Sequence, residues 1–422
     1  MSGMQLGDEP LNELPGTGSA PSRARFGGNP PDVDLHAACV VALLALPGMG
    51  PARLERLLTW CGSGERAWHQ VTAGAPAPVV GAPGRQGSSS NLAARWREAA
   101  TGVDPVARWK AHRSEGVDVL VKGKVGYPDR LVDDPEPPHV LFGRGDLGLL
   151  GRPAVALVGT RRATPYGLVL ARKWGAALAS SGVAVVSGLA AGIDAAAHQG
   201  TLDAGAGPGF TVAPIAVVGT GLDVVYPASS RALWRRVADT GLILSEAPLG
   251  TKPEPWRFPA RNRIIAALAD VVVVIESHER GGSLSTAEEA AARDRMVLAV
   301  PGSVHSPASA GTHRLIADGA GIAVGVDDVL SALGSRRPVP LPERAGRPGH
   351  AGSARGRASA VDPDEQVVLD ALGWEPTVLD DLVHRTGWPI EVVCTVLDRL
   401  RRRNLVTQDG LWLTQRGDSA EP

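Results

Sequence analysis

The stretch FPARNRIIAALADVVVVIES, Phe258–Ser277, predicts a helix that leads directly into a buried strand. The strand half, Val271–Ile275, is a continuous apolar run, which is typical of a strand covered on both faces of a parallel sheet. Arg257, Arg261 and Arg263 crowd the start of the helix. Because guanidinium groups beside a core strand are costly unless they meet an anion, the stretch also predicts an anion-binding site.

Similar apolar runs alternate with helix-like stretches on both sides of this segment, from Pro153 to about Leu333. The other five expected strands are Ala154–Val158, Val183–Val186, Ile215–Val218, Leu242–Leu244 and Val297–Val300. Buried strands separated by helices indicate a doubly wound α/β domain with a parallel sheet. Ligands of such domains bind at the carboxyl ends of the strands.

The pattern divides the chain into five parts. Residues 1–31 are polar and rich in Gly and Pro, and we expect them to be disordered. Residues 32–125 have a helical pattern, and the α/β domain occupies residues 126–334. Residues 335–361 form an expected linker with six Arg and one Glu. Residues 362–416 predict three helices and a short β-ribbon, the arrangement of a winged helix.

Composition restricts the function further. The formal net charge of −1 limits any nucleic-acid surface to a local patch. The three cysteines have no CxxC spacing, which argues against a disulfide framework and a zinc site, and no other metal-ligand cluster is expected. The N-terminal residues do not resemble a signal peptide and no run is long enough to span a bilayer, so we expect a cytoplasmic protein without a membrane partner.

Small-residue turns follow the expected strands and open the next helices. The clearest are VGTRRATPYG (Val158–Gly167), SGLAAGIDAAAHQG (Ser187–Gly200) and SHERGGSLSTAEEA (Ser277–Ala290). Glycines allow close backbone approach there, and amides at a helix start attract anions. Together with Arg161 and the arginines near residue 260, these turns predict a phosphate-lined crevice at one edge of the sheet.

The N-terminal helical part contains LPGMGP, Leu46–Pro51, which resembles the turn of a helix-hairpin-helix motif. The glycine amides of such a turn can hold a phosphate without reading sequence. A plain helix connector explains the same residues, and only Arg53 and Arg56 supply positive charge nearby. The sequence leaves both interpretations open and favours the connector.

Catalytic interpretations find little support. The chain has no GxxxxGK[ST] motif, so it is not a P-loop nucleotide hydrolase. Asp194 and His198 lie four residues apart on an expected helix, with Ser187 nearby, which suggests a hydrolase triad. A structural role is favoured, with Asp194 at a helix start and His198 within a packed layer.

The C-terminal part is acidic. From Asp362 onward it has 12 acidic residues and 6 Arg, a net charge of −6. Its third expected helix, Ile390–Arg403, is basic only at its far end. Because duplex binding depends on neutralised phosphates, this charge favours a protein partner or a scaffold role for the winged helix over duplex binding.

The ordered series of motifs resembles the DNA-processing protein A family (DprA, also called Smf). The resemblance covers about Tyr127 to Ala320 and includes VGTRRATPYG, SGLAAGIDAAAHQGTL, VVGTGLDVVYP, SEAPLGTKP, FPARNRIIAALAD, GGSLSTA and VPGSVHSPASAGTHRLIADGA. It implies an extended Rossmann-like domain between an N-terminal SAM-like helical domain and a C-terminal winged helix. It also implies a non-enzymatic homodimer that binds single-stranded DNA and hands incoming strands to the RecA recombinase during transformation.

The resemblance implies where the strand binds. Side-chain cations would meet phosphates, Phe258, with Trp256 as a second candidate ring, would stack on a base, and no cofactor or metal would take part. The implied residues are Gly159, Arg161, Ser187, Gly188, Lys252, Arg257, Phe258, Arg261, Asn262, Arg263, Gly281, Gly282 and Ser283. The chain departs from the family pattern at Gly281, His313 and Ser230, and none of these departures removes a cation.

A second class of function stays open. Nucleotide-processing enzymes of the LOG type share the superfamily, and their PGGxGTxxE loop is similar to GGSLSTAEE here. Glu288 or Glu289 would then serve as the acid or base. The longer spacing between the glycines and Thr286, and the lack of Pro before Gly281, make this alternative the weaker one.

Overall fold

The computed structural model describes residues 34–75, 89–205, 212–334, 362–372, 377–403, 405–409 and 412–415. The expected disordered N-terminus, residues 1–31, and the expected linker, residues 335–361, lie outside the described residues. Within the described part no helix is long and apolar enough to cross a membrane.

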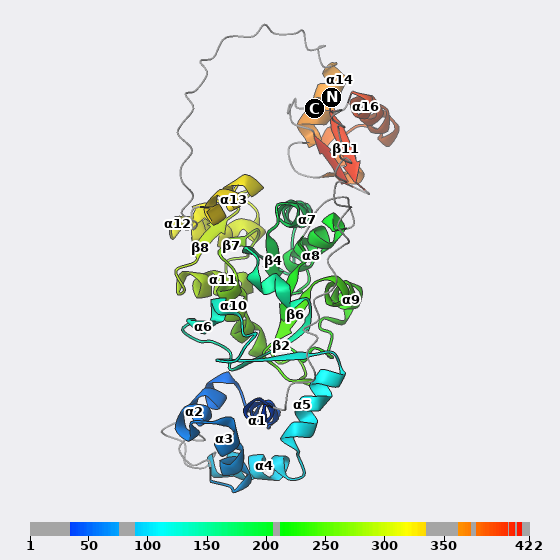
Figure 1. Cartoon of the computed structure of the whole chain (residues 1–422). Coiled ribbons are helices and arrows are strands. Elements are labelled where there is room, and N and C mark those ends of the chain that lie inside the picture. Colours follow the sequence, from blue (N-terminus) through cyan, green and yellow to red (C-terminus); the bar gives the residue numbers. More distant parts are fainter. Residues whose placement is uncertain are drawn as a thin grey trace, which may run out of the picture.

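A nine-stranded mixed sheet in the order β1-β2-β6-β5-β4-β3-β7-β8-β9 forms the centre of the chain (Figure 1). The strands from β6 to β9 in this order run parallel, whereas β2 pairs antiparallel with both β1 and β6. The bounds are β1 Asp118–Val121, β2 Val140–Gly145, β3 Ala154–Val158, β4 Ala184–Ser187, β5 Ile215–Val218, β6 Leu242–Ser245, β7 Val271–Val274, β8 Met296–Ala299 and β9 Gly321–Ile322.

All six strands expected from apolar runs are confirmed, as β3 to β8, but the sheet is not purely parallel. β1, β2 and β9 were not predicted from the sequence, and the residues of β1 were expected to belong to the helical region. β2 ends in Gly-Arg-Gly and β9 has only two residues, so neither shows a long apolar run. At Gly145 (φ 120°) a Cβ atom would lie 2.0 Å from the Gly241 carbonyl oxygen, so this end of β2 requires glycine.

Helices cover both faces of the sheet because its strands bury alternate side chains on each face. Val155 and Leu157 belong to the core under α7, α8 and α13, and Ala154 and Ala156 belong to the core under α10 and α11. The helices of this domain are α6 Asp129–Val132, α7 Pro165–Ser180, α8 Ile193–Ala204, α9 Arg231–Thr240, α10 Arg257–Leu268, α11 Gly282–Ala291, α12 Ala310–Ala317 and α13 Val326–Gly334. This three-layer arrangement is the expected doubly wound, Rossmann-like fold.

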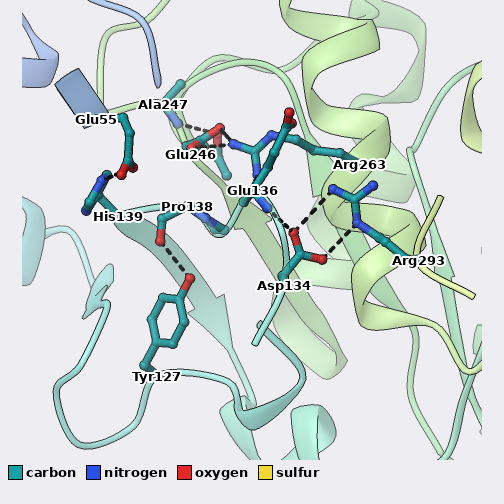
Figure 2. A network of polar contacts seen from close by, with 11 residues as sticks. Glu55, Tyr127, Asp134, Glu136, Pro138, His139, Glu246, Ala247, Arg263 and Arg293 are labelled. Atoms are coloured by element: carbon teal, nitrogen blue, oxygen red, sulfur yellow. Dashed lines mark hydrogen bonds and ion pairs between the residues drawn. The ribbon is translucent and has the colours of Figure 1, made fainter. Parts of the chain in front are cut away.

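Five helices form the N-terminal helical region: α1 Leu35–Leu44, α2 Pro51–Cys61, α3 Gly64–Thr72, α4 Ser89–Ala100 and α5 Pro105–Ser114. Their buried side chains share one core with β2, β5, β6 and α9. A hydrogen bond between Glu55 and His139 (Figure 2) and an ion pair between Lys124 and Asp34 add polar contacts between this region and the segments that flank β1 and β2. The helical region is therefore packed against the sheet.

The C-terminal unit has the winged-helix elements in their expected order. They are α14 Pro363–Leu372, β10 Thr377–Val378, α15 Leu379–Thr386, α16 Ile390–Arg402, β11 Val406–Asp409 and β12 Trp412–Gln415, with the strands in the order β10-β12-β11. The unit has a hydrophobic core of its own. Gly410 of the expected ribbon turn lies outside the described residues.

Candidate nucleic-acid interface

The loops that carry most of the expected site residues meet at the carboxyl edge of the parallel strands. β3 lies between β4 and β7, and the chain leaves β3 and β7 toward opposite sides of the sheet. Such a switch in strand order creates the crevice in which doubly wound domains bind ligands. The loops after β3, β5, β6 and β7 surround this position.

Arg161, Tyr226 and Phe258 form a cation–aromatic group at this edge. The Arg161 guanidinium carbon lies 5.5 Å from the centre of the Phe258 ring, and the Tyr226 ring centre lies 5.3 Å from that of Phe258. The three residues come from the loop after β3, the loop after β5 and the first turn of α10. Arg161 is exposed and Phe258 is half-buried. The fold therefore joins a solvent-accessible cation to an aromatic surface, as the sequence analysis expected for Arg161 and Phe258.

The arginines of α10 do not point to a common ligand. Successive residues of an α-helix differ by about 100°, so Arg261 and Arg263 lie on nearly opposite sides of the helix. Both side chains are buried, each with 7% of the residue exposed. The charge cluster that the sequence shows is thus divided into separate buried contacts.

Arg261 faces the ends of β4 and β5. Its Nη1 donates to the Gly188 carbonyl at 2.8 Å and also to the Val217 carbonyl. Burial lowers the pKa of its guanidinium to about 10, and the nearby Asp194 carboxylate opposes that shift. Burial raises the pKa of Asp194, while Arg261 and the Gly188 amide, which donates to Asp194 at 3.1 Å, oppose the rise. Arg261 and Asp194 hold the loop after β4 together from within.

Arg263 lies in a second network on the other side of α10 (Figure 2). Its Nη2 donates to both carboxylate oxygens of Glu246 at 2.6 Å, and its Nη1 donates to the Glu136 carbonyl. Burial raises the pKa of the Glu246 carboxyl, and the Arg263 charge is the largest opposing cause. In the same network Arg293 donates to Asp134 at 2.8 Å. The two arginines fasten the segment before β2 to the domain core.

Internal carboxylates occupy the helix starts that were expected to face phosphate. At α7, Glu276 accepts from the Thr164 amide at 2.9 Å and from the Thr164 hydroxyl. A Cβ atom on Gly167 would lie 2.4 Å from the Glu276 carboxyl carbon, so the helix start closes tightly on this group. Before α8, Asp194 plays the same part for the Gly188 amide. These two amides, at Thr164 and Gly188, are already satisfied inside the protein.

The start of α11 is tied to α10. Asn262 donates to the Gly282 carbonyl and to the Ser285 hydroxyl, each at 3.3 Å. Ser283 is buried and donates to the Ser277 hydroxyl at 2.9 Å, whereas Gly282 is exposed. Of the Gly281–Ser283 turn, Gly282 is therefore the residue that offers an open backbone surface.

The loop after β6 connects the sheet edge to the hairpin turn Leu46–Pro51. Lys252 is exposed in this loop, and the Arg257 guanidinium lies 4.4 Å from the centre of the Trp256 ring. A Cβ atom on Gly50 would lie 3.5 Å from the far edge of the same ring. The hairpin turn thus lies directly beside the basic loop. The Arg53 guanidinium, however, donates to the Gly48 carbonyl of the hairpin turn itself.

Among the residues of the two enzymatic interpretations, Ser187 and Glu289 have other partners and His198 is buried. The Ser187 hydroxyl donates to the Leu157 carbonyl at 2.6 Å and not to His198. His198 is fully buried, neither ring nitrogen has a hydrogen-bond partner among the described residues, and burial lowers its pKa to about 3, so the ring is neutral. Glu289 pairs with Arg293 at 2.5 Å, and Glu288 is exposed on α11. Within the described ranges no three His, Cys, Asp or Glu side chains are grouped to hold a metal ion.

Two features of the site were absent from the sequence analysis. The first is Tyr226, which the motif VVGTGLDVVYP contains and which is one of only three tyrosines in the chain. The second is the pair of internal carboxylates Glu246 and Glu276, whereas Asp194 was expected at a helix start and lies in the first turn of α8. A lone aromatic residue in a strand-end loop could have indicated Tyr226, but no sequence signal pairs Glu276 with Thr164, 112 residues away.

Comparisons with known proteins agree with the motifs. A family model described as DNA recombination-mediator protein A matches residues 118–334, and one described as DprA winged helix domain matches residues 353–400. The chain is 34% identical over 389 residues to Protein Smf of Synechocystis, covering 86% of this chain and 94% of the relative. It is 43% identical over 205 residues to DNA processing protein DprA of Streptococcus pneumoniae, covering 49% of this chain and 70% of that relative.

A solved structure is similar as well. The X-ray structure of DNA processing protein A from Streptococcus pneumoniae aligns with a TM-score of 0.56 at 34% sequence identity. The alignment covers 70% of this chain and 97% of the other. The likeness thus extends over nearly the whole of that protein.

Proposed function

Since this chain belongs to the DNA recombination-mediator protein A family, we propose that it binds single-stranded DNA at the carboxyl edge of its sheet. The observation that carries the proposal is the contact of the exposed Arg161 with the Phe258 ring at that edge. Single strands are bound by cations that follow the backbone and by aromatic rings that accept bases. The role we propose is to protect the strand and deliver it to the RecA recombinase, without a chemical step.

The exposed or half-exposed cations carry the phosphate contacts in this proposal. They are Arg161 and Lys252, with Arg257 beside them. Arg261, Arg263 and Asn262 act by holding the loops in place, because their side chains bind protein groups. Gly282 is the exposed position at which the strand can approach the backbone closely. Ser187, Gly188 and Ser283 are buried, and a Cβ atom on Gly159 would lie 2.5 Å from the Ile193 side chain, so these residues shape the loops from inside.

A duplex fits this site less well than a single strand. The faces of paired and stacked bases are covered, so only an unpaired base can use an aromatic surface. One pocket contacts few nucleotides, and we propose that a homodimer places two pockets on one strand and gains affinity through effective concentration. The cytoplasm, where recombination takes place, is the compartment we expect.

The test is a binding titration of the full chain with a fluorescent single strand and with the matching duplex, across a salt series. We expect preference for the single strand, with affinity that falls as salt rises. Arg161→Ala should weaken binding and reduce the slope of log affinity against log salt by about 0.7, the value for one lost phosphate contact on a single strand.

Equal affinity of wild type and Arg161→Ala at every salt concentration would contradict the assigned site. Binding to duplex alone would move the activity to another surface, such as the winged helix. Mixing the bound complex with RecA and following filament formation on the strand then tests delivery.

A further inference from the structure

We propose that Tyr226 is the surface on which an unpaired base stacks, with Phe258 supporting it from below. This inference rests on the proposed binding of single-stranded DNA and assigns a base subsite within it. It differs from the expectation that Phe258 itself receives the base.

Tyr226 is an exposed aromatic ring in the loop after β5. The residue is 41% exposed although its side chain is large and apolar. Its ring lies against that of Phe258, with centres 5.3 Å apart and planes inclined by 32°. Among the residues that the structure describes, none forms a hydrogen bond with its hydroxyl group. The ring is thus held in position by one neighbour and offers free surface to another.

The other two aromatic rings at this edge, Phe258 and Trp256, already contact arginine side chains. Phe258 has the Arg161 guanidinium over its ring and Tyr226 beside it. Trp256 has Arg257 over its ring, donates from Nε1 to Glu254 at 2.5 Å, and lies with its edge near Gly50. Trp256 is slightly more exposed than Tyr226, 45% against 41%, but the described residues place a guanidinium group over Trp256 and over Phe258 and none over Tyr226.

The chemistry around Tyr226 suits one nucleotide. Arg161 and Tyr226 both lie within about 5.5 Å of the same ring, so a base on Tyr226 and its phosphate near Arg161 can belong to one unit of the strand. Asp223, three residues earlier in the chain, is exposed, and its carboxylate accepts from the Gly250 amide at 2.9 Å. No base-edge donor or acceptor is needed, so the subsite should accept any base that is unpaired.

The experiment separates base stacking from phosphate binding. Full-length wild type, Tyr226→Leu, Tyr226→Phe and Arg161→Ala are titrated with a fluorescent oligothymidylate and with an otherwise identical strand that lacks its bases. We expect Tyr226→Leu to weaken binding to the thymidylate about tenfold, the usual effect of one lost stacking partner, and to leave binding to the abasic strand unchanged. Tyr226→Phe should bind as the wild type does, because it keeps the ring.

Arg161→Ala should give a different pattern, because it should weaken binding to the thymidylate and binding to the abasic strand by the same factor. Equal affinity of Tyr226→Leu and wild type for the thymidylate would overturn the inference, and so would an equal loss on both strands. If the wild type bound neither strand, the proposed function itself would be wrong, which is a different result from a failure at Tyr226 alone.

Discussion

At the scale of single residues, the site shows that arginines adjacent in sequence can serve unrelated contacts. Arg261 and Arg263 are two positions apart, but the helix sends one to the loop after β4 and the other to Glu246. Both are buried and both have protein acceptors, so neither needs a DNA phosphate to offset its burial. Arg161, which is exposed, is the arginine whose charge remains available to a ligand.

This division predicts opposite phenotypes for two arginine substitutions. Arg263→Met leaves the Glu246 carboxylate buried without its partner, and should lower the free energy of unfolding by about 3–5 kcal/mol. The double variant Arg263→Met/Glu246→Leu should recover most of that loss, because both charges are then absent. Urea unfolding of the three proteins measures the effect.

Arg161→Ala is the matched control, and its unfolding free energy should stay within about 0.5 kcal/mol of the wild type. A stable Arg263→Met protein that no longer bound single-stranded DNA would contradict this assignment. It would mean that Arg263 contacts the strand directly, as its position in the motif first suggested.

At the scale of elements, apolar runs predicted the six strands from β3 to β8 and missed the strands nearest the two ends of the sheet, β1, β2 and β9. β3 to β8 follow from local composition alone. β1 and β2 pair residues that lie 19 to 25 positions apart in the chain, and β9 has only two residues, so their sequences carry little signal. The same limit applies to the helix starts, because the carboxylate at α7, Glu276, belongs to a strand end far along the chain. The sequence therefore identified the loops that form the site, but not the internal carboxylate that binds the amide at a helix start.

One glycine connects two of these loops. Gly192 precedes α8 with φ 86°, and a Cβ atom there would lie 2.3 Å from the Thr160 carbonyl oxygen. Gly192→Ala should therefore displace the Thr160–Arg161 backbone, adding to the cost of about 1 kcal/mol for the positive φ. We expect the affinity for single-stranded DNA to fall at least severalfold, measured by the same titration.

Gly182→Ala is the control for backbone strain alone. Gly182 has φ 80°, and no atom lies within 4 Å of its added Cβ, so this variant should lose a similar amount of stability but bind DNA normally. If Gly192→Ala bound as tightly as Gly182→Ala, the loop after β3 would have no part in binding.

At the scale of the whole molecule, charge is distributed unevenly over a nearly neutral chain. All thirteen expected site residues lie within the Rossmann-like domain, whereas the residues from Asp362 onward have a net charge of −6. The described part of the winged helix uses several of its arginines internally, as in the Arg399–Asp362, Arg401–Asp398 and Arg403–Glu365 pairs. Composition predicted that the basic surface is local, but the pairing of these arginines with carboxylates depends on the fold.

A chain that ends at Val361 tests this separation of roles. It retains the Rossmann-like domain and the arginine-rich segment, and it loses only the acidic unit, whose core is independent of the sheet. We expect its affinity for single-stranded DNA to stay within about twofold of the full chain, with the same salt dependence, since no phosphate contact is removed. A tenfold loss at every salt concentration would place part of the strand on the winged helix. An unchanged single-strand affinity together with loss of a protein partner would instead assign that unit to protein binding, which is the role its acidic surface favours.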